Sequence, residues 1–241
     1  MEKDEQNWAA ASGRLSLGPD RVDVWRIRAH PSWGSRAFRM ALLSAGERER
    51  AGRFVSSRVR EAFILAHGAL RLILSRYLGV APGDLRFGAL ENGKPVLAGR
   101  DGPGSLEFNL SHTDGCALLA VASDRSVGLD VERIRGRLDP LDLARRFFAP
   151  GETKQLRILK PGGERRQAFF RCWTLKEAYL KLKGEGLPSG LHRFEVEFPP
   201  GGPLALLRTD LAGEPAASVH LTGLPAGGGY AAALAVDGPP P

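Results

Sequence analysis

An aromatic ring, a carboxylate and an ammonium group follow one another at intervals of four residues inside an otherwise apolar run. Trp173, Glu177 and Lys181 therefore share one face of a predicted helix, which the glycines at 184 and 186 should end. A pair of opposite charges at this spacing can be an ordinary surface ion pair, which contributes only ~0.3 to 0.5 kcal/mol. It can also belong to a functional site, and a second acidic motif upstream favours that interpretation.

The second motif is a strand-like run, Val127–Ile134, that carries two acids two positions apart. Asp130 and Glu132 project from the same face of a strand. Neighbouring carboxylates raise each other's pKa unless a cation lies between them, so this pair is either exposed or built around a positive charge. A third carboxylate from Glu177 would complete an all-oxygen ligand set that suits Mg²⁺. Zinc is disfavoured, because there is no Cys-x-x-Cys and the five histidines are scattered.

Together the motifs resemble those of a known family. The signature pair of the 4'-phosphopantetheinyl transferases is similar to Gly128-Leu-Asp130-Val-Glu132 followed by Trp173-x-x-Lys176-Glu177-Ala-x-x-Lys181-x-x-Gly184-x-Gly186. The length and the flanking motifs resemble the Sfp-type branch. Two further family motifs match Glu91-Asn-Gly93-Lys94-Pro95 and Phe108-Asn109-Leu-Ser111-His112. The first motif is short and the second is specific, and the resemblance covers roughly residues 40 to 190.

The resemblance implies roles for the acidic cluster and its lysine. Asp130, Glu132 and Glu177 match the family's Mg²⁺ ligands, with Mn²⁺ as the alternative metal, and Glu177 also matches the proposed general base. Lys181 matches the lysine that neutralises charge on the pyrophosphate of coenzyme A. The alternative for Lys181 is a lysine that only complements the dipole at the end of a helix. The role of Lys176 stays open, since it points away from Glu177.

The resemblance also implies a basic side of the site. Lys94, Ser111 and His112 match residues that hold the nucleotide and 3'-phosphate of coenzyme A, although a polar group at the end of a strand can serve a turn instead. Further phosphate-binding candidates are Arg50, Arg53 and Arg60, for which a solvated helix face is the alternative. Glu47 falls where some family members place a lysine, which leaves that contact in question. His67 has no motif around it and is interpreted as structural.

The chain contains an internal duplication. The run that begins with Val22-Asp23 aligns with Leu129-Asp130 at an offset of 107 (130 minus 23), and later segments align at offsets of 106 to 108. We therefore predict an α+β fold that is a pseudo-dimer of two similar halves, 1–123 and 124–241, each with a long helix on a small antiparallel sheet. Opposite Glu132, Glu177 and Lys181 the first copy has Trp25, Arg71 and Ser75. The acids thus occur once, which predicts one composite site at the junction, and the resemblance implies that coenzyme A lies there.

Composition agrees with this prediction. The 241 residues are 43% hydrophobic with a net charge of +7, as expected for a globular protein that favours acidic partners. No nucleic-acid-binding motif is present, no apolar run approaches the ~20 residues that span a bilayer, and the acidic start is unlike a signal peptide. Cys116 and Cys172 are isolated in apolar contexts, which favours unpaired thiols and the cytoplasm.

The expected activity is that of the family. The protein would transfer the 4'-phosphopantetheine arm of coenzyme A to a serine of an acidic apo acyl or peptidyl carrier protein, as a monomer, and release adenosine 3',5'-bisphosphate. The sequence leaves open whether the carrier serves fatty acid, polyketide, nonribosomal peptide or lysine biosynthesis. The alternative is a noncatalytic module that binds coenzyme A or a carrier protein. Such a module would keep Lys94 and His112 but lose an acid or Lys181, and none of these is lost.

Overall fold

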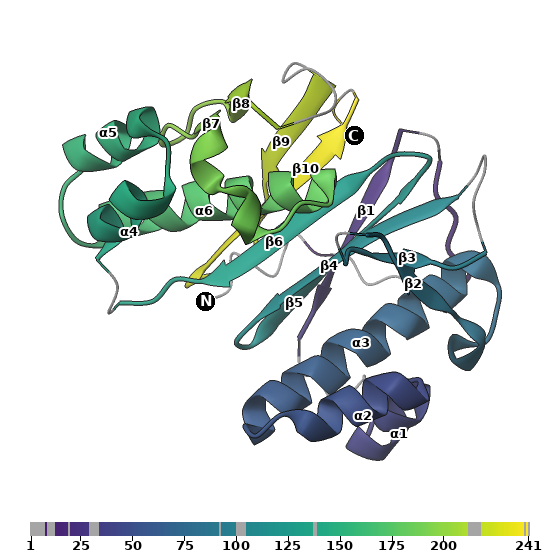
Figure 1. Ribbon diagram of the computed structural model, residues 1–241. Coiled ribbons are helices and arrows are strands. Elements are labelled where there is room, and N and C mark those ends of the chain that lie inside the picture. Colours follow the sequence, from purple (N-terminus) through teal and green to yellow (C-terminus); the bar gives the residue numbers. More distant parts are fainter. Residues whose placement is uncertain are drawn as a thin grey trace.

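The computed structural model describes residues 8, 13–18, 20–28, 34–91, 93–99, 105–136, 139–211, 218–238 and 240. Across these ranges, no helix has both the length and the apolar composition needed to cross a membrane. The helices and strands form two series that follow one another along the chain (Figure 1).

The first series builds a three-stranded antiparallel sheet covered by a long helix. The sheet has the order β1-β5-β4, and β2 and β3 form a separate antiparallel pair. The elements are β1 Val22–Ile27, α1 Arg36–Leu42, α2 Ala45–Arg53, α3 Ser57–Leu78, the 3-10 turn η2 Pro82–Asp84, β2 Phe87–Ala89, β3 Pro95–Leu97, β4 Leu106–Thr113 and β5 Cys116–Ser123.

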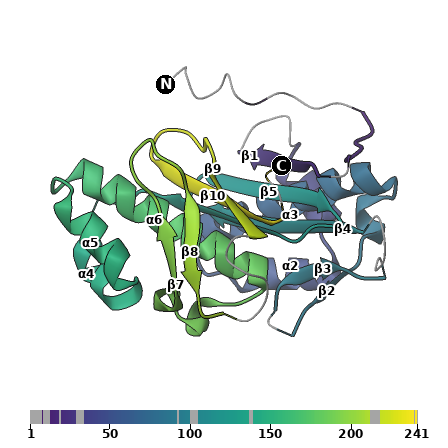
Figure 2. The same cartoon turned by 90° about the horizontal axis from the view of Figure 1, so that it is seen from above.

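The second series repeats this plan. Its sheet has the order β6-β10-β9, and β7 and β8 form the second separate pair. The elements are β6 Val127–Arg133, α4 Pro140–Phe147, α5 Pro150–Ile158, α6 Gly163–Lys183, the 3-10 turns η3 Leu187–Ser189 and η4 Leu191–Arg193, β7 Phe194–Glu197, β8 Ala205–Thr209, β9 Val219–Gly223 and β10 Tyr230–Asp237. Figure 2 shows α4 and α5 at one end of the molecule and β2 and β3 at the other.

The two sheets have the same strand order. β6, β10 and β9 occupy the places that β1, β5 and β4 have in the first sheet, and α6 packs on its sheet as α3 does. This confirms the predicted α+β pseudo-dimer of two similar halves. The proposed boundary between residues 123 and 124 falls in the short connection between β5 and β6.

The long helices correct the alignment of the two copies. α3 and α6 end at Gly79 and Gly184, both in the left-handed conformation, and these glycines are 105 positions apart. The helix ends therefore pair Arg71 with Lys176, whereas the sequence alignment at an offset of 106 paired Arg71 with Glu177. Periodicity alone does not detect a slip of one residue inside a helix. The asymmetry of the acids survives the correction, because the counterpart of Glu177 becomes Leu72. The predicted pairing of Lys181 with Ser75 was wrong, because the counterpart of Lys181 becomes the basic Arg76.

The contacts of these two cations support the corrected alignment. Arg71 donates to Glu47, whose carboxylate also caps the start of α2 by accepting from the backbone N of Ser44. Lys176 donates to Glu152, whose carboxylate caps the start of α5 by accepting from the backbone N of Ala149. In both halves one acid thus fixes a short helix to the long one.

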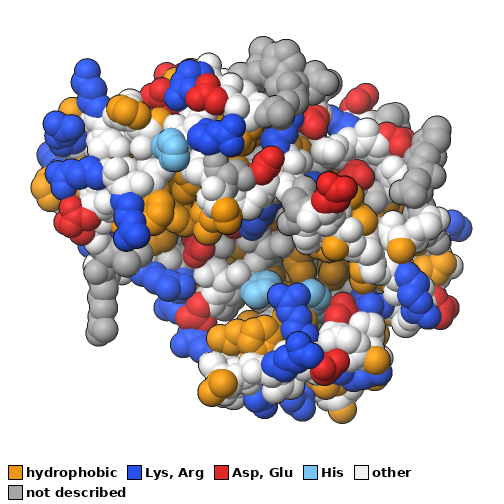
Figure 3. All heavy atoms as spheres, viewed as in Figure 1, with side chains coloured by type: hydrophobic (Ala, Val, Ile, Leu, Met, Phe, Trp, Pro, Cys, Tyr) orange, Lys and Arg blue, Asp and Glu red, His pale blue; other side chains and the backbone are white. Residues whose placement is uncertain are grey.

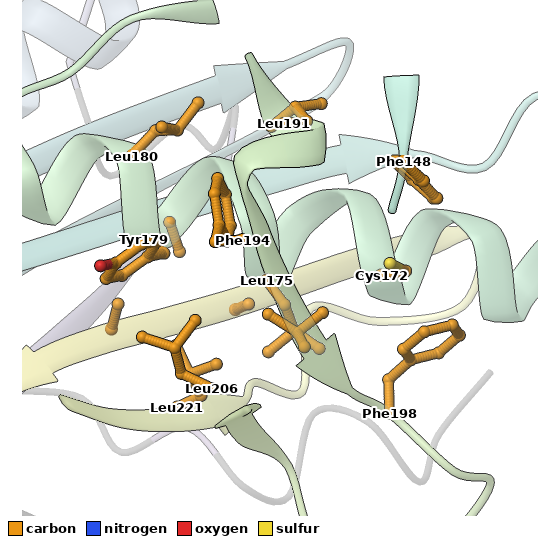
Figure 4. Packing of buried hydrophobic residues seen from close by; sticks show 14 of the residues in the cluster. Phe148, Cys172, Leu175, Tyr179, Leu180, Leu191, Phe194, Phe198, Leu206 and Leu221 are labelled. Carbon is orange, nitrogen blue, oxygen red and sulfur yellow. The ribbon is translucent and has the colours of Figure 1, made fainter. Parts of the chain in front are cut away.

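Each half has its own apolar core. In the second half, Tyr179 of α6 and Phe194 of β7 pack edge to face with their ring centroids 4.8 Å apart, and Leu175 lies beside them (Figure 4). A third cluster joins the halves, with Leu118 of β5 packed between the two sheets against residues such as Leu129 of β6. These cores fix the two sheets side by side.

Polar side chains complete the seam between the sheets. Leu129 and Val131 of β6 donate their backbone N–H groups to Asn109 Oδ1 at 2.9 Å and to Ser111 Oγ at 3.3 Å. Side chains of β4 thus replace a backbone ladder between β4 and β6, and buried N–H groups require such partners. The seam brings Ser111 of the first half to the strand that carries Asp130 and Glu132.

Gly128, the glycine of the first motif, permits the close approach of α6 to β6. A Cβ atom at this position would lie 2.0 Å from the carbonyl oxygen of Ala178 and 2.3 Å from the backbone N of Leu182. Both neighbours are backbone atoms of α6, so the helix itself would have to move. The glycine therefore sets the distance between the strand with two acids and the helix with the third.

We predict that Gly128→Ala lowers the free energy of unfolding by about 3 kcal/mol, because the added methyl overpacks a backbone contact. Gly52→Ala is the matched control: it lies in α2 with no atom within 4 Å of the added Cβ, so it should be neutral or slightly stabilising. Urea unfolding of both variants measures the difference. Equal stability of Gly128→Ala and wild type would contradict the packing argument.

Candidate functional site

Lys181, Asp130 and Ser111 form a hydrogen-bonded cluster where the halves meet. Lys181 Nζ, in the last turn of α6, lies 2.7 Å from Asp130 Oδ1, 3.0 Å from Ser111 Oγ and 3.1 Å from the carbonyl oxygen of Leu129. Ser111 Oγ also donates to Asp130 Oδ1 at 2.9 Å. The three ammonium protons are thus directed to three acceptors. Lys181 is a fixed, inward-pointing cation rather than a lysine that only complements the helix dipole.

The other two acids lie within electrostatic range of this cluster. Glu132 accepts a hydrogen bond from Thr113 Oγ1 at 3.3 Å. Burial raises the pKa of Glu132, and the charge of Asp130 raises it further. Burial, followed by the charges of Asp130 and Glu132, raises the pKa of Glu177 to about 7 against the opposing effect of Lys181. The fold thus groups the three predicted acids and gives one of them a pKa near neutrality.

The carboxylate oxygens of these three acids suit a hard cation. Asp130 Oδ2 and Glu177 Oε1 are buried, and neither has a hydrogen-bond partner among the residues that the structure describes. A divalent cation would supply that partner and offset the repulsion among the acids. The described residues contain no set of three His, Cys, Asp or Glu side chains already arranged as a metal site. The carboxylate oxygens are therefore suitable ligands for Mg²⁺, but the described residues do not form a preorganised metal site.

Lys176, whose role the motif left open, is a buried residue on the side of α6 that faces α5 and β7. Its side chain is fully buried, donates to Glu152 and to the carbonyl oxygen of Phe194 at 2.7 Å, and lies over the ring of Phe194. Glu152 also accepts from the backbone N of Val196 at 2.9 Å. The pair ties α5, α6 and β7 together and thereby fixes the rotation of the helix that carries Glu177.

His112 lies at the end of β4, exposed, next to the acidic cluster. Partial desolvation lowers its pKa, and the positive charges of His67, Lys181 and Arg50 lower it further. The histidine also lines a pocket of about 570 Å³ with Arg39 and Arg58. His112 thus lies within electrostatic range of His67, Lys181 and Arg50.

Lys94 reaches across the seam at a different point. Its Nζ donates to the carbonyl oxygen of Val127 in β6 at 3.1 Å, and desolvation lowers its pKa. It lines a pocket of about 300 Å³ that both halves build, with Phe108 on one wall and residues 182–184 at the end of α6 on the other. Asn92 of the same motif lies outside the described residues.

The three candidate phosphate-binding arginines, Arg50, Arg53 and Arg60, have different surroundings. The Arg50 guanidinium lies 5.3 Å from the ring centroid of Phe63 and faces His112. Arg53 forms an exposed ion pair with Glu49 at 2.5 Å, and Arg60 donates to the carbonyl oxygen of Phe54 at 2.7 Å. Arg50 therefore lies within electrostatic range of His112, whereas Arg53 and Arg60 make local contacts.

One bridging residue had no signal in the motifs. Asp114, in the turn between β4 and β5, accepts hydrogen bonds from Arg58 of the first half and from Arg133 of the second, the latter at 2.6 Å. Desolvation alone would raise the pKa of Asp114, but Arg133 and Arg58 outweigh it and lower the pKa. An acid in a hairpin turn usually serves the turn itself, so only the three-dimensional structure reveals this link between the halves.

Comparisons with known proteins agree with this arrangement. A family described as "4'-phosphopantetheinyl transferase superfamily" matches residues 126–235, and one described as "4'-phosphopantetheinyl transferase, N-terminal" matches residues 29–124. The 4'-phosphopantetheinyl transferase HetI of Nostoc sp. is 40% identical over 202 residues, which cover 84% of each chain. The chain belongs to the 4'-phosphopantetheinyl transferase superfamily.

Other similar members of this superfamily come from distant organisms. The 4'-phosphopantetheinyl transferase Sfp of Bacillus subtilis is 29% identical over 167 residues, which cover 69% of this chain and 71% of Sfp. The L-aminoadipate-semialdehyde dehydrogenase-phosphopantetheinyl transferase of Homo sapiens is 30% identical over 162 residues, which cover 64% of this chain and 52% of the human protein. All the acids and bases grouped at the junction of this phosphopantetheinyl transferase lie in the two matched ranges.

We predict that Glu177→Gln stabilises the metal-free transferase at pH 8 and does so much less at pH 5. The folded-state pKa of Glu177 is raised from 4.5 to about 7, so the native protein binds the proton more tightly than the unfolded chain. Its contribution to stability is complete below about pH 4.5 and is lost as the pH rises through about 7. Glutamine has no charge to desolvate, and the gain at pH 8 should reach up to about 3 kcal/mol.

Urea unfolding in EDTA at both pH values measures this gain, with the exposed Glu49→Gln as control. An identical change at pH 5 and pH 8 would show that Glu177 titrates normally.

Proposed function

We propose that this transferase moves the 4'-phosphopantetheine arm of coenzyme A to a serine of an apo acyl or peptidyl carrier protein. The observation that carries the proposal is the cluster of Lys181, Asp130 and Ser111 at the junction, with two more carboxylates beside it. A cation held among acids suits a polyphosphate ligand with its metal better than it suits an acyl or hydride transfer.

In the proposed site the two halves have different tasks. Lys94, Ser111, His112 and Arg50 of the first half hold phosphate and nucleotide groups of coenzyme A, and Lys181 neutralises the pyrophosphate. Support for this division comes from the basic surroundings of His112 and from the pocket beside Lys94. Arg53 and Arg60 remain candidates with weaker support. Asp130, Glu132 and Glu177 would hold Mg²⁺ or Mn²⁺, which when bound supplies charge neutralisation and polarises the phosphate oxygens.

Glu177 is proposed to accept the proton of the attacking serine, directly or through a water molecule. Its pKa of about 7 lies close to the working pH, which is where a general base is effective. The serine oxygen forms a bond to the phosphorus that bears the pantetheine arm, and the bond from that phosphorus to the bridging oxygen breaks. Adenosine 3',5'-bisphosphate leaves with the electron pair, and the fixed ammonium of Lys181 lies where negative charge develops.

The net charge and the cysteines support the proposed carrier protein and a cytoplasmic location. The net charge of +7 suits an acidic carrier protein. Cys116 and Cys172 are both buried and free, which is consistent with the reducing cytoplasm.

The experiment that tests this function is mass spectrometry of purified apo carrier proteins from fatty acid, polyketide and peptide synthesis after incubation with coenzyme A and Mg²⁺. A mass gain of one phosphopantetheine group on the carrier serine supports the transfer. Tight binding of coenzyme A or carrier without any mass gain would instead favour a noncatalytic binding module.

We predict that Asp130→Asn and Glu132→Gln each lower kcat at least about 100-fold while the fold persists. Removing a metal ligand and its charge weakens charge neutralisation at the pyrophosphate, an effect worth several kcal/mol of activation energy. Asp210→Asn, an exposed acid paired with Arg208, is the control and should leave kcat unchanged. Near-normal turnover of both site variants would refute the assignment of these acids.

We also predict one coenzyme A per chain in a monomer. The first copy has Trp25 and Leu72 where the second has Glu132 and Glu177, so only one junction can hold a metal and a pyrophosphate. Titration calorimetry combined with light scattering measures stoichiometry and mass together. Two equivalent sites per chain would contradict the asymmetry between the halves.

A further inference from the structure

The turn that joins β4 to β5, residues 113–115, is held by the second half of the protein. Tyr230 Oη donates to the backbone carbonyl oxygen of Asp114 at 2.8 Å, and Arg133 Nη1 donates to Asp114 Oδ2 at 2.6 Å. Tyr230 and Arg133 are direct partners in the pairing of β10 with β6. One point of the second sheet therefore holds both the backbone and the side chain of Asp114.

The first half holds the same carboxylate. Arg58, near the start of α3, also donates to Asp114 Oδ2. Asp and Glu side chains lie beside Lys or Arg side chains at several places on the surface (Figure 3), and a single exposed ion pair contributes little to stability. Asp114 differs in that its side chain is only 29% exposed and is shared by arginines from both halves. This arrangement fixes where the turn lies between the halves.

Gly115 allows Tyr230 to approach the turn. The glycine has a φ of +83°, and a Cβ atom at this position would lie 2.7 Å from Tyr230 Oη. A side chain there would be strained and would collide with the hydroxyl group of the ring. The residue that follows Asp114 therefore leaves room for the contact with the second half.

Thr113, the last residue of β4, connects the turn to the acidic cluster. Its Oγ1 donates to Glu132 Oε2 at 3.3 Å. Asp130 is held by Lys181 and Ser111. For Glu132, by contrast, Thr113 is the only hydrogen-bond donor among the residues that the structure describes. The orientation of the Glu132 carboxylate therefore depends on where the turn places Thr113.

We propose that Asp114 is a positioning residue, which holds the turn so that Thr113 keeps the Glu132 carboxylate oriented as a ligand for a divalent cation. Partners that orient a metal ligand affect the metal affinity of a site although they do not touch the metal. The inference rests on the proposed function and deepens it, because it names a residue that no motif indicated.

The first test measures Mn²⁺ binding by electron paramagnetic resonance in the presence of coenzyme A and without a carrier protein. Asp114→Asn should raise the Kd for Mn²⁺ about tenfold, because the turn loses its ion pairs and Glu132 loses its fixed orientation. Asp114→Glu keeps the charge and should restore most of the affinity. Asp210→Asn is the matched control: it removes one negative charge from another ion pair with an arginine and should leave the Kd unchanged.

A double-variant cycle with Thr113→Val shows whether Asp114 acts through Thr113. Thr113→Val removes the hydroxyl group, keeps the shape of the side chain and should raise the Kd for Mn²⁺ by a similar factor. The double variant should bind Mn²⁺ no more weakly than Thr113→Val alone. Additive effects would mean that the lost charge acts through space, and they would overturn the proposal. Lower stability of Asp114→Asn in urea with an unchanged Kd would also overturn it, because a contact that only joins the halves gives that result.

Turnover provides a second readout. The Mg²⁺ concentration for half-maximal turnover should rise about tenfold in Asp114→Asn, with kcat at saturating Mg²⁺ close to that of wild type. If no carrier protein is modified while Mn²⁺ binding still depends on Asp114 and Thr113, the proposed function fails and the positioning role stands. Absence of Mn²⁺ binding by the wild-type protein overturns the positioning role.

Discussion

The contact between Lys181 and Asp130 is the interaction on which the candidate site depends. Burial raises the pKa of Glu177 to about 7, together with the repulsion from Asp130 and Glu132 in the half-buried junction. One ammonium group, with all its protons directed to acceptors from both halves, offsets part of it. What remains uncompensated is a pair of buried carboxylate oxygens without partners in the described part of the chain. Under the proposed function, a bound cation would offset this repulsion and would thereby stabilise the site.

Contacts outside the acidic cluster fix the geometry of that junction. Gly128 lets the backbone of α6 approach β6, and the buried pair of Lys176 and Glu152 fixes the rotation of the same helix. The first half uses the same arrangement with Arg71 and Glu47, but there the acid has an additional neighbour in His67. Duplication thus supplied two equivalent contacts between a short helix and a long one, one in each half.

Sequence patterns predicted the parts of the fold that depend on local chemistry. The paired glycines ended α6 at Gly184, the alternating acids lay on β6, and the repeated order of segments predicted two sheets of the same topology. The one-residue slip between the helices was missed, because an amphipathic helix tolerates a shift that changes few apolar positions. The burial of Lys176 and the orientation of His67 depend on partners 24 and 20 positions away, and no pattern within one helix encodes such contacts.

We propose that one half supplies the binding residues and the other half the catalytic residues of a single site. Steady-state kinetics of His112→Ala and of Glu177→Gln test this division most directly. The account predicts that His112→Ala raises KM for coenzyme A with little change in kcat, because its contacts are made in ground and transition states alike. Glu177→Gln should lower kcat far more than it changes the Kd for coenzyme A. If His112→Ala and Lys94→Ala both left the Kd and KM for coenzyme A unchanged, the first half would not line the site and the composite-site account would be wrong.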